Sequence, residues 1–135
     1  MAHNEKASTP PRKRVLIVDD SSLVRLYYSH ALEKAGFDVE QAINGIEAME
    51  KVLAHDFNLA IVDVNMPRMD GLSFVRALRR STSDVAALPT LMITTEAGPQ
   101  DVEDARMAGA NYYLVKPVSE DDLVRHVAVL TGMPA

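Results

Sequence analysis

The chain has 135 residues, which is long enough for one domain with a substantial hydrophobic core. Hydrophobic residues make up 47% and charged residues 24%, as in ordinary globular proteins. The formal net charge of −5 argues against sequence-independent nucleic-acid binding, and the absence of cysteine excludes disulfides, thiolate metal sites and a thiol nucleophile.

The ends and the apolar runs bear on location. Residues 1–12 (MAHNEKASTPPR) are polar, contain proline and have no periodicity, which predicts a disordered tail before a domain over residues 13–132. No apolar run approaches the roughly 18 residues that cross a bilayer, and the N-terminus has no signal-peptide core. We therefore expect a cytoplasmic protein without membrane insertion.

Short apolar runs alternate with amphipathic stretches along the chain, a pattern typical of repeated strand–helix units. The apolar runs predict strands over residues 15–18, 37–41, 59–62, 88–93 and 112–115. The amphipathic stretches predict helices over about 22–35, from 44 past 53, and over 71–80, 99–108 and 119–131, while residues 81–84 predict a loop.

Capping residues mark the starts of several helices. Asp20 or Ser21 can cap the first helix and Ser119 the last, and Asn44 followed by Glu47 resembles a capping box. The predicted core-facing positions are Leu23, Val24, Tyr27, Ala31 and Leu32 in the first helix, Ile46, Met49, Val52 and Leu53 in the second, Phe74, Val75 and Leu78 in the third, and Leu123, Val127 and Leu130 in the last. The arginines expected on the exposed side of the third helix are Arg76, Arg79 and Arg80.

Five strand–helix units with short connections predict an α/β fold, a parallel sheet with helices on both faces. The strand order 2-1-3-4-5 of the flavodoxin-like fold is the natural candidate. The first and third strands then flank the point where the order reverses, which is where such sheets bind ligands.

Polar side chains follow four of the predicted strands. Asp19 and Asp20 follow the first strand, Asp63 the third, Thr94 the fourth and Lys116 the fifth. Taken singly, each has an ordinary explanation, such as a helix cap, a turn or strand propensity. Because parallel strands end at the same edge of a sheet, we expect all five to converge, and chance alone seldom produces such a set.

The converging groups predict a particular chemistry. Three carboxylates in one crevice repel each other unless a cation lies between them. Oxygen ligands without cysteine favour a hard ion such as Mg²⁺. Lys116 can pair with Asp63 or with a phosphoryl oxygen, and Thr94 offers a hydroxyl donor. These are the parts needed to form an aspartyl phosphate.

Four stretches resemble the receiver domain of bacterial two-component response regulators, and they occur in that family's order and spacing. They read VLIVDDSSLVR, LAIVDVNMPRMDG, LMITTEAG and GANYYLVKP, and the similarity extends over about residues 13–131. The chain is most similar in style to stand-alone receivers of the chemotaxis type. The resemblance implies the following roles: Asp63 as phosphoacceptor, Asp19, Asp20, Asp63 and the backbone carbonyl of Asn65 as Mg²⁺ ligands, Lys116 at the phosphoryl group, Thr94 as switch hydroxyl and Tyr113 as switch aromatic.

Two further positions bear on how long a phosphoryl group would persist. Asn65 and Glu96 each lie two residues after a site residue and flank the path of a hydrolytic water. Chemotaxis-type receivers carry the same pair, so the resemblance implies fast dephosphorylation. Tyr112, beside Tyr113, departs from the family pattern, and strand alternation favours opposite faces for the two rings.

The resemblance implies a phosphorylation switch that catalyses only its own phosphorylation and dephosphorylation. A histidine kinase would be the phosphodonor, and a downstream protein would bind the face formed by residues 98–108 and 112–124. Chemotaxis signalling is the leading interpretation, with a phosphorelay intermediate or a developmental or cell-cycle regulator as the alternative. An aspartyl-nucleophile phosphatase is disfavoured because Asn65 stands where such enzymes place a second aspartate. A docking module that is never phosphorylated is a third interpretation.

Overall fold

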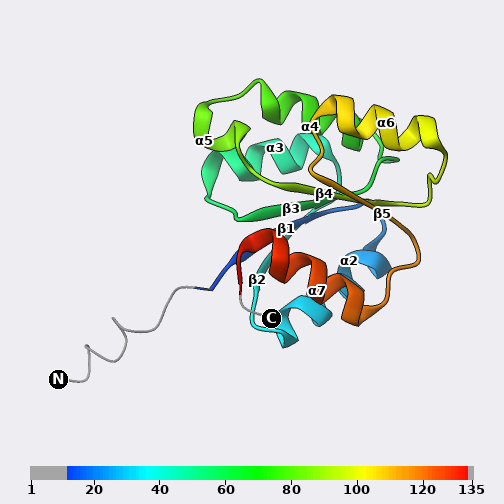
Figure 1. Cartoon of the computed structure of the whole chain (residues 1–135). Coiled ribbons are helices and arrows are strands. Elements are labelled where there is room, and N and C mark those ends of the chain that lie inside the picture. Colours follow the sequence, from blue (N-terminus) through cyan, green and yellow to red (C-terminus); the bar gives the residue numbers. More distant parts are fainter. Residues whose placement is uncertain (1–11, 134–135) are drawn as a thin grey trace.

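A parallel sheet covered by helices on both faces makes up the part of the chain that the computed structural model describes, residues 12–133 (Figure 1). The strands are β1 (Arg14–Val18), β2 (Asp38–Ala42), β3 (Leu59–Val62), β4 (Thr90–Thr94) and β5 (Tyr112–Val115). The helices are α2 (Ser22–Lys34), α3 (Gly45–Ala54), α4 (Gly71–Arg79), α5 (Ser83–Ala86), α6 (Pro99–Ala108) and α7 (Glu120–Thr131). Apart from Arg12, the predicted tail over residues 1–12 lies outside the described residues.

The strand order is β2-β1-β3-β4-β5, and all four pairs of neighbours are parallel, which confirms the predicted fold. The last residue of β1, Val18, pairs with Ala42 of β2 on one side and with Val62 of β3 on the other. The carboxyl ends of these three strands therefore lie level at one edge of the sheet. None of the described helices is long and apolar enough to cross a membrane.

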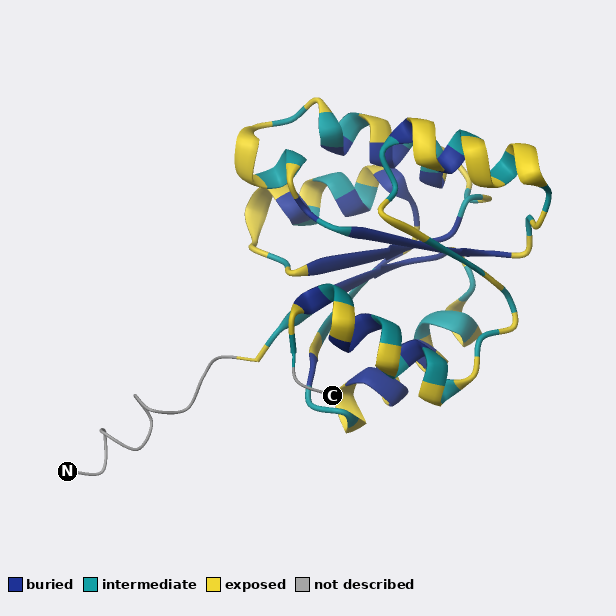
Figure 2. Cartoon of the chain, in the orientation of Figure 1, coloured by how far each residue is buried: buried dark blue, intermediate teal, exposed yellow. Residues whose placement is uncertain are grey.

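Two hydrophobic layers cover the sheet. Because successive strand residues point to opposite faces, Leu16 and Val18 pack beneath α3, α4 and α6, whereas Val15 and Ile17 pack beneath α2 and α7. Figure 2 shows that the strands in the middle of the sheet are buried along their length. Continuous burial on both faces explains why these strands read as unbroken apolar runs in the sequence.

Side-chain caps begin the helices close to the predicted positions. Of the two candidates for α2, Ser21 is the cap, and its Oγ accepts the amide hydrogen of Val24 at 3.3 Å. The Oδ1 of Asn44 accepts from the amide of Glu47 at 2.9 Å. The Glu47 carboxylate in turn accepts from the amide of Ile43 at 2.8 Å, and not from the amide of Asn44 as in a standard capping box. The expected capping box is thus present with its return bond shifted by one residue.

Several predicted core positions are wrong. Leu23 and Tyr27 on α2 are 78% and 45% exposed, and Ile46 and Leu53 on α3 are 43% and 61% exposed. The residues that these helices bury are Tyr28, Ser29, Ala31 and Leu32 on α2 and Gly45, Ala48 and Val52 on α3. Both helices carry apolar residues on more than one side, so their periodicity does not decide which side meets the sheet. In α3, Ala48 packs in the layer with the strand residues, and Gly45 permits a close approach to Met69, since a Cβ at position 45 would lie 2.5 Å from the Cγ of Met69.

Residues predicted as a loop after α4 include a single helical turn, α5. The amide of Ala86 donates to the carbonyl of Thr82 at 2.7 Å, which closes this turn. Four residues are too few to show helical periodicity, so the pattern of polar residues there indicated only a loop.

Arg79, at the end of α4, was predicted to be exposed, and this prediction is wrong. Its guanidinium bridges three segments: Nε donates to the carbonyl of Gly109 at 3.0 Å, and Nη1 donates to the carbonyls of Ala86 and Leu88 at 3.0 and 2.7 Å. Nη2 donates to Oδ1 of Asn111 at 2.8 Å. One side chain therefore ties the end of α4 to the approach of β4 and to the turn between α6 and β5.

We expect Arg79→Met to lower the free energy of unfolding by about 2–4 kcal/mol, because hydrogen bonds to charged groups contribute about 1.5–3 kcal/mol each and the variant leaves partly buried acceptors without a donor. Urea denaturation measures this change. The matched control is Arg80→Met at the neighbouring exposed position, where we expect a change within about 0.5 kcal/mol. Equal effects of the two substitutions on the free energy of unfolding would contradict the bridging role of Arg79.

Candidate functional site

Main-chain hydrogen bonds place the polar residues at the carboxyl edge of the sheet. In each case the ladder between two strands continues for one more bond, so the residue after the strand is held as firmly as the strand itself. The bonds run from the amide of Asp19 to the carbonyl of Ala42 (3.1 Å), from Asp63 to Val18 (2.9 Å) and from Lys116 to Thr94 (2.8 Å).

The three carboxylates converge, as the sequence predicts. Each of Asp19, Asp20 and Asp63 offers an oxygen atom that lies within 4.8 Å of the others. Asp19 and Asp63 are 2% and 9% exposed, whereas Asp20 lies at the exposed rim. The cluster is therefore closed on the side of the sheet and open toward solvent.

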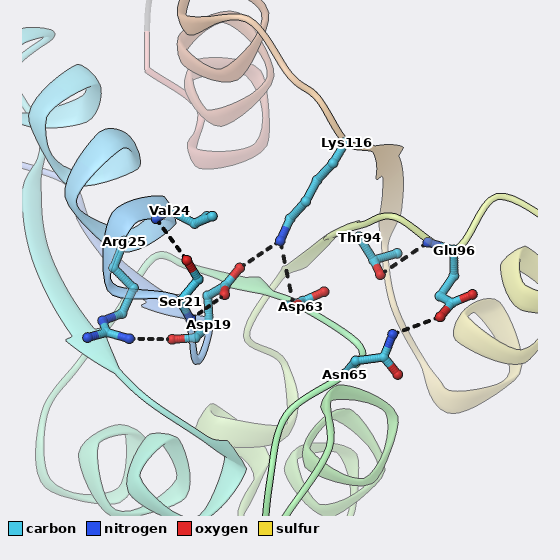
Figure 3. Close-up of polar contacts among 9 residues, drawn as sticks. All are labelled: Asp19, Ser21, Val24, Arg25, Asp63, Asn65, Thr94, Glu96 and Lys116. Atoms are coloured by element: carbon cyan, nitrogen blue, oxygen red, sulfur yellow. Dashed lines mark hydrogen bonds and ion pairs between the residues drawn. The ribbon is translucent and has the colours of Figure 1, made fainter.

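Lys116 reaches into the cluster from the end of β5 (Figure 3). Its Nζ lies 3.0 Å from Oδ2 of Asp19 and 3.6 Å from Oδ2 of Asp63. From the sequence we expect this lysine to pair with Asp63 or a phosphoryl group, but its shorter contact is with Asp19. A single ammonium thus bridges two carboxylates, and the cluster retains an excess of negative charge.

The environment of Asp63 raises the pKa of its carboxyl group above the ordinary value. Burial is the largest cause, and the charge of Asp19 adds to it. The ammonium of Lys116 and hydrogen bonds from Thr94 and from the amide of Val64 act in the opposite direction without cancelling the rise. Crowding of like charges in a partly dry crevice therefore makes ionised Asp63 costly until a cation or another partner compensates it.

The loop after β3 folds back beneath Asp63, and Gly71 makes this possible. A Cβ atom at position 71 would lie 2.1 Å from the carbonyl oxygen of Asp63, which is far inside van der Waals contact. The amide of Gly71 donates to the carbonyl of Val64 at 2.9 Å, and Asp70 caps α4 through the amide of Ser73 at 2.7 Å. The sequence indicated only a chain break at Gly71; its role in supporting Asp63 depends on contacts that a sequence does not contain.

Glu96 links the outer groups of the site. Its carboxylate accepts from Nδ2 of Asn65 at 2.7 Å, and its amide donates to Oγ1 of Thr94 at 3.4 Å (Figure 3). Its carbonyl accepts from the hydroxyl of Tyr113 at 2.6 Å. The loop after β4 therefore connects the mouth of the acidic cluster with Tyr113 on β5.

The two adjacent tyrosines of β5 point to opposite faces of the sheet, as strand alternation predicts. Tyr113 packs in the layer formed with α3, α4 and α6. The ring of Tyr112 is 47% exposed and lies with its centre 5.3 Å from the ring centre of His126 on α7. Of the two tyrosines, Tyr113 is the one whose hydroxyl bonds to the loop after β4.

The donor set suits a hard cation. The cluster offers carboxylate oxygens, sits beside an open rim and carries more negative charge than Lys116 neutralises. Oxygen ligands of this type bind divalent cations such as Mg²⁺ or Ca²⁺ in preference to softer metals. No other group of three acidic or histidine side chains with this spacing occurs within residues 12–133.

The raised pKa of Asp63 predicts how stability depends on pH. The folded state holds the proton of this carboxyl group more tightly than the unfolded chain, so the contribution of Asp63 to stability falls as the pH rises through its folded pKa. We expect Asp63→Asn to unfold at a higher urea concentration than the wild type in metal-free buffer at pH about 7.5, and the difference to narrow as the pH falls toward about 4.

Denaturation of both proteins across this pH range, in a chelator, measures the effect. A divalent cation added in place of the chelator provides the control, because it should stabilise the wild type more than the variant, which lacks one carboxylate. A variant that is less stable than the wild type at neutral pH without metal would show that the carboxylates are not under repulsion.

Comparison with known proteins agrees with this geometry. The family model described as the response regulator receiver domain matches residues 15–128. The chemotaxis protein CheY1 of Helicobacter pylori is 41% identical over 121 residues, which cover 88% of this chain and 97% of CheY1. The sensor protein EvgS of Escherichia coli is 37% identical over 130 residues, 96% of this chain but 11% of EvgS.

Solved structures extend the similarity to three dimensions. The chemotaxis protein CheY4 of Vibrio cholerae superimposes with a TM-score of 0.84 at 39% identity, covering 89% of this chain and 99% of that protein. Fold and sequence comparisons thus agree. The chain belongs to the response regulator receiver domain family.

Proposed function

We propose that this protein is a chemotaxis-type response regulator that accepts a phosphoryl group on Asp63 from a histidine kinase. The single observation that carries the proposal is the largely buried carboxylate of Asp63, crowded by Asp19 and Asp20 and faced by the ammonium of Lys116. Similarity to chemotaxis proteins over nearly their whole length supports the biological assignment. Because the proposed phosphodonor is a histidine kinase, we propose a cytoplasmic location for the protein.

In the proposed reaction, a carboxylate oxygen of Asp63 attacks the phosphorus of a phosphohistidine. The new P–O bond forms as the P–N bond breaks, and the electron pair stays on the imidazole nitrogen, which takes up a proton from solvent. Lys116, 3.6 Å from Asp63, is positioned to neutralise charge on the transferred group. Thr94 is buried beside Asp63, and its hydroxyl offers a hydrogen-bond donor.

Asp19, Asp20, Asp63 and the backbone carbonyl of Asn65 would hold Mg²⁺. Bound Mg²⁺ supplies positive charge that compensates the carboxylates and the phosphoryl oxygens. The crowding of three carboxylates around one lysine supports this assignment, because the cluster is one cation short of balance.

The connection through Glu96 supports a switch. A phosphoryl group on Asp63 adds acceptor oxygens, and Thr94 would turn its hydroxyl toward them. The amide of Glu96 would then lose its 3.4 Å contact with that hydroxyl, and the Tyr113 hydroxyl, bonded to the Glu96 carbonyl, would follow the loop. Phosphorylation of Asp63 would thus shift the equilibrium between two conformations of the loop after β4.

The proposed partner surface is the face formed by α6, β5 and α7, which continues from this loop. Figure 2 shows exposed positions along α6 and α7, and several of the exposed residues on this face are apolar. The exposed apolar residues are Val102, Met107, Tyr112, Val115 and Val129. A downstream protein that binds there would sense the position of the loop after β4.

A phosphorelay intermediate is the second candidate within the family. It is favoured by the similarity of this chain to one segment of the sensor protein EvgS. Phosphotransfer separates the two: a relay intermediate passes its phosphoryl group on to a second histidine protein, whereas a terminal regulator loses it to water.

We expect acetyl phosphate and Mg²⁺ to produce a single phosphoryl adduct, detected by intact mass. Asp63→Asn should give no adduct, and omission of Mg²⁺ should abolish it in the wild type, because Asp63 is the nucleophile and the metal compensates its charge. Absence of an adduct in the wild type, together with failure to bind beryllofluoride, would indicate a receiver fold used for docking alone. Turnover of phosphate esters without a stable adduct would indicate a phosphatase instead.

We also expect the adduct to decay within minutes in Mg²⁺ buffer, because Asn65 and Glu96 lie at the open mouth of the site and leave a path for water. Asn65→Met should lengthen the lifetime several-fold by placing an apolar side chain in that path. The control is Arg76→Met on the exposed side of α4, which should decay like the wild type. A wild-type half-life of hours would contradict the prediction.

A further inference from the structure

Arg25, on the second turn of α2, contacts the acidic cluster through the main chain. Its Nη1 donates to the carbonyl oxygen of Asp19 at 2.7 Å, a short charge-assisted bond, while its Nε donates to Oε1 of Gln41 at 3.0 Å. Figure 3 shows the guanidinium on the far side of Asp19 from Lys116. The arginine thus directs both hydrogen bonds at neutral oxygens, although it lies next to a cluster of carboxylates.

Gln41 is itself held in one orientation. It lies on the edge strand β2, and its Nε2 donates to Oγ of Ser29 on α2 at 3.0 Å. Ser29 is 5% exposed. Because a guanidinium has donors and no acceptor, the amide of Gln41 must present its oxygen to Arg25 and its nitrogen to Ser29. The chain Ser29–Gln41–Arg25 therefore fixes the guanidinium beside the carbonyl of Asp19.

We infer that Arg25, oriented by Gln41, is a positioning residue for the metal site and acts through the peptide that joins Asp19 and Asp20. This inference rests on the proposed function. A peptide unit is planar, so a hydrogen bond that holds the carbonyl of Asp19 also fixes the amide of Asp20 and the direction in which the next residue leaves the chain.

Asp20 is the carboxylate that needs this support. The side chain of Asp19 is already held, since its Oδ1 accepts from the amide of Ser21 at 2.9 Å and its Oδ2 faces Lys116 at 3.0 Å. Asp20 lies exposed at the rim, so the peptide before it sets the backbone position from which its carboxylate reaches toward the cluster. Loss of the Arg25 bond would leave the cluster with one carboxylate free to turn toward solvent.

Charge alone does not explain the arrangement. A guanidinium is a planar fork that donates in two fixed directions, whereas a lysine is a point charge on a flexible stem. Two simultaneous bonds, to a main-chain carbonyl and to an amide oxygen, need the fork. Arg25→Lys keeps the charge but removes that geometry, and it therefore separates positioning from electrostatics.

The experiment is a calorimetric titration of the full chain with Mg²⁺, carried out at a temperature where thermal unfolding shows each variant to be folded. We expect Arg25→Met to weaken Mg²⁺ binding by about tenfold or more, the usual effect of losing a residue that orients a metal ligand. Gln41→Met should weaken it several-fold, and Arg25→Lys should not restore wild-type affinity. Gln41→Met also keeps the test available if Arg25→Met does not fold.

The matched control is Arg14→Met at the opposite end of β1, where the arginine pairs with Glu40 at 3.2 Å. Its Mg²⁺ affinity should equal that of the wild type. Repeating the titrations in about 0.05 and 0.5 M KCl, between which the Debye length shrinks about threefold, tests for a long-range charge effect. The ratio between wild type and Arg25→Met should persist in the higher salt if the effect is geometric.

Four results would overturn the inference. Equal affinities of the wild type and Arg25→Met would show that the carbonyl bond has no role in the metal site. Full rescue by Arg25→Lys, or a difference that vanishes in high salt, would assign the effect to charge. If the wild type binds no Mg²⁺, the proposed metal function and this inference both fail. If the wild type and Arg25→Met bind Mg²⁺ equally well, only the inference fails.

Discussion

The parallel register of β1 with its two neighbours is the constraint on which the site depends. Val18 pairs with Ala42 on one side and with Val62 on the other, so the residues that follow these strands emerge at the same level. The amides of Asp19 and Asp63 extend the ladder by one bond and carry the two carboxylates to the edge. Because a slip of one residue would turn every side chain of a strand to the other face, the buried core that fixes the register also fixes the site.

Burial and the crowding of like charges at that edge make the ionised form of Asp63 costly. Burial and the neighbouring Asp19 raise the pKa of Asp63, and Lys116 compensates only part of the charge. Such a cluster is stabilised by any partner that brings positive charge or that bonds to one of the carboxylate oxygens. In the proposed function, metal binding and phosphorylation would both respond to this excess of negative charge, and the hydrogen bond between the Glu96 carbonyl and the Tyr113 hydroxyl would link the loop after β4 to β5.

The polar residues on which the site and the fold depend belong to two groups that differ in how visible they are in a sequence. Asp63 and Lys116 directly follow short apolar runs, where a charged residue marks the end of a strand. Arg25 and Arg79 sit in amphipathic helices among other polar residues, where the pattern indicates only a solvated side. Their roles appear only when a helix packs, because their partners lie outside the helix: the carbonyl of Asp19 after β1 for Arg25, and the carbonyl of Gly109 after α6 for Arg79.

The sequence by itself determined the order of strands and helices, the parallel fold and the set of side chains that meet at the carboxyl edge, since burial on both faces leaves unbroken apolar runs and parallel strands end together. Only the tertiary structure decided which side of α2 and α3 is buried, which leaves Leu23 and Leu53 exposed. It also decided that Lys116 lies nearer to Asp19 than to Asp63. Such choices depend on distances between segments remote in sequence, and neither periodicity nor local propensity encodes those distances.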